Sequence, residues 1–166
     1  MVMRLGAAIC VAVTMVVVYS SVSRARLVDH YQLNLHVVAA GPLIRGIAST
    51  YNPYRPGYRS GGRETASGER YDPAAWTAAI QTNLREIFGG VRYGKEYRPV
   101  FALVMSADKQ VIVKINDVGP LEPGRVIDFN EQTMRYFDPA LQHGLIPISV
   151  TPLLGDDWLA GPIKNS

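Results

Sequence analysis

The chain has 166 residues, 48% of them hydrophobic and 19% charged, with a net charge of +3 at pH 7. This length allows one domain with a core of its own, and so weak a charge excludes the concentrated basic face that nucleic-acid binding needs. Eleven prolines and fifteen glycines favour a turn-rich, mainly β architecture over a bundle of helices.

The chain begins with a targeting segment. Residues 5–19 form an uninterrupted, mostly apolar run that follows a single positive charge, Arg4. Ser23 and Ala25 stand where a signal peptidase requires small residues, and the run is shorter than the roughly 20 residues of a membrane span. We therefore predict that residues 1–25 are a cleaved signal peptide and that the protein is exported to the periplasm or cell envelope. The alternatives are a retained anchor over residues 5–19, in contact with the inner membrane, and a buried core helix.

The numbers and positions of cysteine and histidine limit which metal sites and nucleophiles the exported part can contain. Cys10 is the only cysteine and lies inside the apolar run. Cleavage would therefore leave a chain without disulfides, cysteine metal sites or cysteine nucleophiles. His30, His36 and His143 are scattered with no metal-ligand spacing. We expect neither a metal site nor a cofactor.

A linker over residues 26–43, with a short strand over 33–39, leads into the domain. Residues 44–51 are small and β-branched and predict its first strand. Residues 52–70 form a long loop, and such loops in compact domains are mostly functional or disordered. Five arginines and two glutamates lie between residues 45 and 70. They indicate either a solvated loop or a surface that binds an anionic polymer.

The next segment predicts a helix over residues 72–89. Asp72 is a suitable N-cap and Pro73 a suitable first helical residue. Apolar residues then recur at helical spacing until a glycine ends the pattern: Trp76, Ile80, Leu84, Ile87 and Gly89. Trp76 and Ile80 are therefore interpreted as core residues of this helix.

The rest of the chain predicts strands over residues 100–105, 111–115, 126–129 and 146–153. Asn130 is expected to cap a helix over residues 131–137. Pro147 and Pro152 place the last strand at a sheet edge, or themselves at its ends. Residues 154–166 are expected to be a loosely ordered tail. The sequence contains neither an internal repeat nor a second domain.

Two carboxylates are predicted to lie at turns. Asp117 follows the apolar strand over residues 111–115, and Glu69 ends the small polar turn over residues 64–69. Carboxylates that a rigid sheet presents in loops can meet a ligand, and a pair of them suggests acid/base work on a glycosidic bond. The alternatives are structural, with Asp117 capping its own turn and Glu69 solvated.

Five segments resemble the rare lipoprotein A (RlpA)-like family of double-psi β-barrels: residues 46–51 (GIASTY), 65–72 (TASGERYD), 77–79 (TAA), 113–120 (VKINDVGP) and 124–128 (GRVID). Their order agrees with the family over residues 44–153. The resemblance implies a mainly β fold, a six-stranded double-psi β-barrel with one or two short helices. It also implies a groove related in shape to those of expansins and family 45 glycosidases.

The same resemblance implies lytic transglycosylase activity on peptidoglycan, which cleaves MurNAc–GlcNAc bonds and forms 1,6-anhydroMurNAc during wall remodelling or septation. Peptidoglycan glycan strands would be the substrate, with division-site proteins as a further partner. Asp117 maps to the family's acid/base carboxylate and Glu69 to its second carboxylate. The family's histidine is replaced by Ile80, so an expansin-like binding module without turnover is the alternative, and a membrane-tethered scaffold is a third.

Six residues are expected to bind the substrate: Tyr51, Thr65, Ser67, Asn116, Arg125 and Asp128. Tyr54 and Tyr58 are further candidates for stacking on sugar faces. Asp128 has the alternative role of satisfying loop backbone, and Arg125 that of pairing with Asp128 or Asp117.

Overall fold

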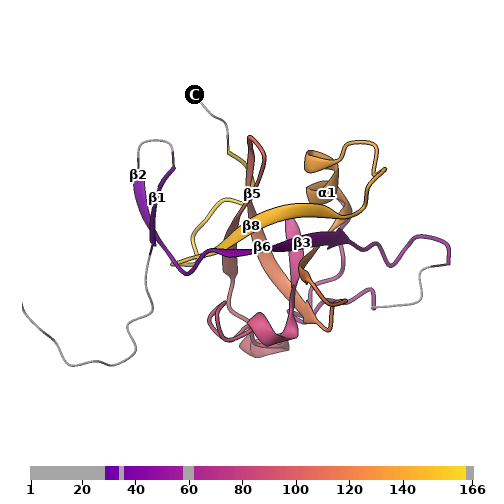
Figure 1. Ribbon diagram of the computed structural model, residues 1–166. Helices are drawn as coiled ribbons and strands as arrows, with labels where there is room; N and C mark the ends of the chain where they lie inside the picture. Colours follow the sequence, from indigo (N-terminus) through magenta and orange to yellow (C-terminus); the bar gives the residue numbers. More distant parts are fainter. Residues whose placement is uncertain (1–28, 34–35, 58–61, 164–166) are drawn as a thin grey trace, which may run out of the picture.

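The computed structural model describes residues 29–33, 36–57 and 62–163, so the predicted signal peptide and Tyr58 lie outside the described residues. The barrel strands are β3 (Ile44–Thr50), β4 (Thr77–Gln81), β5 (Val100–Ser106), β6 (Lys109–Gly119), β7 (Arg125–Phe129) and β8 (Ile146–Leu153). They pair in the order β8–β3–β7–β4–β6–β5, and β5 pairs back onto β8 to close the barrel (Figure 1). The prediction of a mainly β fold with a six-stranded barrel is confirmed.

Two pairs in this barrel are parallel, β3 with β7 and β4 with β6, and the other pairs are antiparallel. Parallel neighbours need long connections. The connection between β3 and β4, described over residues 51–57 and 62–76, projects from one side of the barrel (Figure 1). This connection carries the Thr65–Glu69 turn that lies against β6 through the hydrogen bond from Ser67 N to Asn116 O, 3.0 Å.

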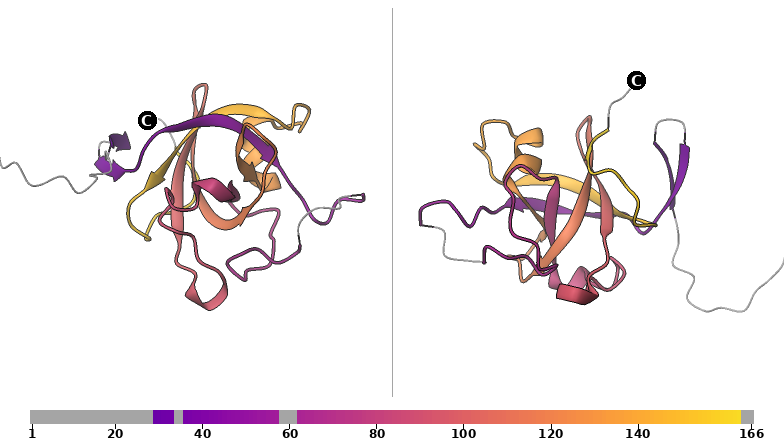
Figure 2. Two further views of the ribbon diagram at one scale, coloured as in Figure 1. Left: turned by 60° about the horizontal axis from the view of Figure 1, so that its bottom comes forward. Right: turned by 180° about the vertical axis from the view of Figure 1, so that it is seen from behind.

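Smaller elements surround the barrel. The hairpin of β1 (Asp29–Leu33) and β2 (His36–Ala40) projects from the side opposite the long connection (Figure 2) and joins β8 through Ala40 and Leu153. Helix α1 (Glu131–Phe137) follows β7, and the 3-10 turns are η1 (Thr82–Leu84) and η2 (Gly94–Glu96). Among the described residues, no helix is long and apolar enough to cross a membrane.

The core is built from the inward-facing half of each strand. On β6, Val111, Val113 and Ile115 are fully buried, and Ile127 and Phe129 are fully buried on β7. Side chains of a strand alternate between its two faces, so the residues between them point out of the barrel. Each large apolar side chain removed from water contributes about 1.5–3 kcal/mol.

The helix predicted over residues 72–89 is wrong. Residues Thr77–Gln81 form β4, which lies between β6 and β7, and only Thr82–Leu84 adopts a helical turn, η1. Asp72 begins a local turn instead, because its carboxylate accepts the backbone N–H of Ala74 at 2.9 Å. Pairing with two neighbouring strands outweighs the helical spacing of the apolar residues.

Strand β6 extends beyond its prediction, and this corrects the position of Asp117. The predicted strand ended at residue 115 and Asp117 began a turn, whereas β6 continues to Gly119. Its extension pairs in parallel with β4, where Gln81 is the partner of Gly119. Asp117 is therefore held in a strand rather than presented by a loop.

A β-bulge in this pair sets the direction of Asp117. Ala78 is the partner of Ile115, but the next residue of β4, Ala79, is the partner of Asp117. Asn116 is the extra residue. Because Ala78 and Ile115 face the core, Ala79 and Asp117 face outward.

The strands predicted over residues 44–51, 100–105, 126–129 and 146–153 and the helix predicted over 131–137 are confirmed, and three other predictions need correction. In place of the short strand expected over residues 33–39 there are two strands, Asp29–Leu33 and His36–Ala40, which pair with each other. Asn130 caps α1, since its Oδ1 accepts the N–H of Thr133 at 3.0 Å. Strand β8 is not at an edge, because it pairs with both β3 and β5, and Pro147 and Pro152 lie near its ends. The tail is more ordered than expected, since β9 (Gly161–Pro162) pairs with β6.

Candidate active site

One row of residues crosses the outer face of the barrel on four adjacent strands. Ser49 of β3 is the partner of Asp128 of β7, which is the partner of Ala79 of β4, which in turn is the partner of Asp117 of β6. Two strand spacings separate the Cα atoms of the two aspartates by about 9–10 Å. The barrel thus presents two carboxylates on one face, with only the methyl group of Ala79 between them.

Asp117 is half-buried and held by backbone donors. Its Oδ1 accepts the N–H groups of Ala66 and Val118, each at 2.9 Å. Burial raises the pKa of the Asp117 carboxyl above 3.8, although the N–H groups of Ala66 and Val118 and the Tyr51 side chain lower it. Both backbone donors bind the same oxygen, Oδ1, and so fix the orientation of the carboxyl group.

Asp128 is the second acid of this face. Burial raises the pKa of Asp128 to about 6, against the lowering effects of Ser49 and of the positive charge of Arg125. The charge of Asp117 raises that pKa further. Arg125 therefore acts electrostatically on Asp128, which was one of the roles considered for it.

Aromatic residues form one side of this face. The rings of Tyr51 and Tyr71 meet edge to face at 4.9 Å and form a small buried cluster with Ala79. Tyr51, Ala79, Asp117 and Asp128 line an open hollow of about 350 Å³ that continues toward Pro120. The two aspartates thus share this hollow with the Tyr51 ring and with a third carboxylate, that of Glu64.

Glu69 lies elsewhere. Its Oε1 is 2.5 Å from Lys114 Nζ, and its Oε2 accepts Asn116 Nδ2 at 3.1 Å. Burial raises the pKa of Glu69, but the bonds from Lys114 and Asn116 outweigh it, so the pKa lies below 4.5. Glu69 lines a second hollow, of about 340 Å³, that Asp117 does not line. Asp117 therefore shares its hollow with Asp128, not with Glu69 as the paired turns had suggested.

Thr65 and Ser67 shape the turn that carries Glu69. Both side chains are buried, and their hydroxyl oxygens are 2.9 Å apart. The Thr65 hydroxyl donates to Glu69 O at 3.0 Å, and the Ser67 hydroxyl accepts Glu69 N–H at 3.2 Å. Asn116 is also buried and connects this turn to β6.

Two residues noted in the sequence, Ile80 and Tyr54, line neither of these two hollows. Ile80 is fully buried in the core, so the prediction of a core position is confirmed, although it lies in a strand. Tyr54 is 39% exposed and meets Tyr71 edge to face at 5.9 Å. Lys114 was not predicted as a site residue. Its signal in the sequence is a charged residue between the apolar residues Val113 and Ile115 of its strand.

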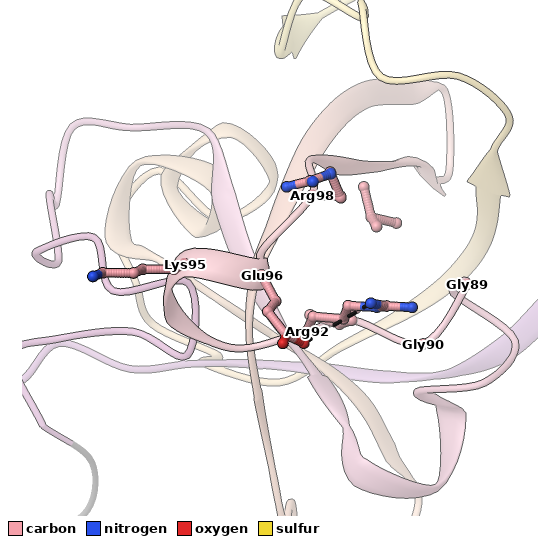
Figure 3. A pocket seen from close by; sticks show the side chains of 8 residues that line it. Gly89, Gly90, Arg92, Lys95, Glu96 and Arg98 are labelled. Atoms are coloured by element: carbon pink, nitrogen blue, oxygen red, sulfur yellow. Dashed lines mark ion pairs between the residues drawn. The ribbon is translucent and has the colours of Figure 1, made fainter.

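Another hollow lies away from the carboxylate pair. Its volume is about 500 Å³, and Figure 3 shows the side chains of Arg92 and Arg98 in it, with Glu96 turned toward Arg92. None of Asp117, Asp128 and Glu69 lines it. In the described part of the chain, no three His, Cys, Asp or Glu side chains gather to hold a metal ion.

A family whose description reads "Lytic transglycolase" matches residues 44–150. Endolytic peptidoglycan transglycosylase RlpA of Yersinia pestis is 39% identical over 51% of this chain and 19% of its own length. RlpA of Campylobacter jejuni is 31% identical over 68% of this chain and 34% of its own length. A probable RlpA of Nostoc is 33% identical over 66% and 25%.

The chain thus spans between a fifth and about a third of the length of these curated relatives. Among solved structures, the Streptomyces papain inhibitor is 16% identical, with a TM-score of 0.50 over 69% of this chain and 96% of that one. That likeness supports the barrel fold alone. On the match over residues 44–150, the chain belongs to the RlpA-like family of double-psi β-barrels.

Proposed function

We propose that this protein is a peptidoglycan lytic transglycosylase in which Asp117 is the single acid/base residue. The observation that carries the proposal is the state of Asp117. It is half-buried in an open hollow, its pKa is raised by burial, and one of its oxygens is fixed by two backbone N–H groups. A raised pKa lets one carboxyl group act first as an acid and then as a base.

The reaction follows in two steps. Protonated Asp117 gives its proton to the oxygen that bridges MurNAc C1 and GlcNAc, and the C1–O bond breaks. The Asp117 carboxylate then takes the proton of the MurNAc C6 hydroxyl as O6 bonds to C1 and closes the 1,6-anhydro ring. Asp117 ends protonated again, and no water is consumed.

The neighbours of Asp117 have supporting roles in this proposal. Once ionised, Asp117 and Asp128 place negative charge next to the positive charge that develops at C1. Glu69 is ion-paired with Lys114, so we assign it to binding and orienting the glycan rather than to proton transfer. Tyr51 forms the wall against which a sugar ring packs.

The relatives' names support peptidoglycan as the substrate, and a peptidoglycan-acting protein works in the cell envelope. Export by residues 1–25, an anchor over residues 5–19 and division-site partners stay proposals. So do the domain limits, a linker over residues 26–43, a barrel domain over 44–153 and a tail over 154–166.

A second candidate, a non-catalytic wall-binding module, is favoured by one observation. Ile80 occupies the position of the family's histidine and is fully buried, so it offers the groove no polar group. The two functions differ in whether Asp117 is needed for turnover or only for the shape of the groove.

The test uses the full chain and its Asp117→Asn variant on purified peptidoglycan sacculi. The asparagine side chain of this variant keeps an oxygen for the two backbone donors, so the fold is preserved. We expect the wild type to release soluble fragments, the variant to lose that release by about 10²–10⁴-fold, and both to sediment with sacculi. Sedimentation of both without release by either would support the binding module instead.

A further inference from the structure

We infer that the hollow beside Glu69 is a second saccharide subsite, in which Trp76 stacks on an N-acetylhexosamine unit next to the pair that Asp117 cleaves. This inference rests on the proposed function and adds to it a specificity-determining residue. Glu69, Trp76, Thr77, Lys114 and Ala160 are among the residues that line the hollow of about 340 Å³.

The bulge at Asn116 puts this hollow and the Asp117 hollow on one face. Thr77 of β4 is the partner of Lys114, and Ala79 of β4 is the partner of Asp117. Residues two apart on a strand point the same way, about 7 Å from each other. In a regular strand, Lys114 and Asp117, three residues apart, would point to opposite faces, and the bulge at Asn116 brings them to the same face. A glycan strand that crosses this face therefore meets both hollows in succession.

Trp76 is positioned as a fixed platform. Its ring is half-buried and meets Tyr136 edge to face at 5.9 Å with an interplanar angle of 82°. Small residues surround it, since Ala160 lines the hollow and a Cβ atom at Gly161 would lie 3.8 Å from Trp76 Nε1. A rigid aromatic ring loses little entropy when a sugar ring packs on it.

The polar groups of this hollow suit a neutral polyol. Lys114 and Arg70 are balanced by Glu69 and Asp72, so the lining carries no net charge that would select an anion. The Lys114–Glu69 pair and Asn116 offer donors and acceptors in fixed positions. An aromatic face with a few convergent polar groups is the usual composition of a small-ligand site.

The test measures binding of β-1,4-linked GlcNAc oligomers, from the dimer to the hexamer, by isothermal titration calorimetry, with Trp76 fluorescence as a second readout where Trp76 is present. The protein is the full chain with Asp117→Asn and Trp158→Phe. The chain has two tryptophans, so Trp76 is then the only one that fluoresces. We expect a saturable change in Trp76 emission that appears with the longer oligomers. Trp76→Ala is expected to weaken hexamer binding about tenfold and to leave dimer binding unchanged.

Two further variants keep the result interpretable if Trp76→Ala unfolds. Trp76→Phe retains a smaller ring and is expected to bind with intermediate affinity. Lys114→Met removes the charge and the ion pair with Glu69 at a similar side-chain length, and is expected to weaken hexamer binding alone. Hexamer binding without a Trp76 response, and with equal affinity for all variants, overturns the subsite and leaves the proposed function intact. Absence of oligomer binding also overturns it. A Trp76 response in a protein that releases no fragments from sacculi supports the subsite while the transglycosylase proposal fails.

Discussion

Asp117 and Asp128 lie at the same level of the sheet, on the two strands that flank Ala79, and the charge of Asp117 raises the pKa of Asp128. Removing that charge should therefore lower the pKa of Asp128 from about 6. Carbon-detected NMR titration of the aspartate carboxyls in Asp117→Asn is the measurement. An unchanged Asp128 titration would mean that the two groups do not interact.

Asp128 should make the stability of the protein depend on pH. Its pKa is about 6 in the fold against an ordinary 3.8, so the folded state holds the proton more tightly. Stability is then full below about pH 3.8 and is lost as the pH rises to about 6, by roughly 3 kcal/mol. Urea unfolding should show Asp128→Asn to be more stable than the wild type at pH 8 and equal to it at pH 4. Equal stability at both pH values would contradict the burial of this charge.

Glu69 should contribute to binding but not to proton transfer. The pKa of Glu69 is lowered by Lys114 and Asn116, so it carries no proton to give at neutral pH. Glu69→Gln is expected to raise KM for solubilised glycan strands about 2- to 10-fold with little change in kcat. Steady-state kinetics beside Asp117→Asn provide the comparison. A collapse of kcat in Glu69→Gln would assign acid/base chemistry to Glu69.

Asn130 should stabilise the start of α1 and its contact with the turn that follows Asp72. Its Oδ1 caps α1, and its Nδ2 donates to the carbonyls of Asp72 and Ala75. Asn130→Ala removes the cap and leaves two carbonyls without their donor, so it is expected to cost about 2–4 kcal/mol of unfolding free energy. Asn130→Ser restores only the cap and should recover part of the loss. Identical denaturation midpoints for the two variants would show that the cap contributes nothing.

Strands with short apolar, β-branched runs were predictable from the sequence. The sequence predicts β6 from Val111, Val113 and Ile115, and β7 from Ile127 and Phe129. One face of each strand must be apolar to fill the barrel. The position of Asn130 before Glu131 likewise predicts the start of α1. These patterns are local, so no tertiary knowledge is needed to interpret them.

The segment after Asp72 shows why other elements were not predictable. Trp76, Ile80 and Leu84 have helical spacing, but Ile80 is buried between strands that come later in the chain. Whether a segment forms a central strand depends on the strands that pair with it. A strand of five residues has too few residues for its own pattern to be distinguished from a helical one.

The acid pair depends on register, which a sequence does not display. Asp117 and Asp128 come together only through Ala79 and the bulge at Asn116. The sequence places Asp117 and Glu69 each at a predicted turn, and so suggested that these two carboxylates form the pair. Asp128 was expected only to bind substrate or to satisfy backbone groups. Its position in the fold adds a pKa that burial and the charge of Asp117 raise to about 6.

The most direct test of the account is the chemical nature of the ends produced from peptidoglycan. Digests by the wild type and Asp117→Asn would be analysed by mass spectrometry for 1,6-anhydroMurNAc and for reducing MurNAc ends. The account predicts anhydro ends from the wild type and almost none from the variant. Reducing ends from the wild type, or equal anhydro ends from both proteins, would contradict the assignment of Asp117 as the single acid/base residue of a transglycosylase.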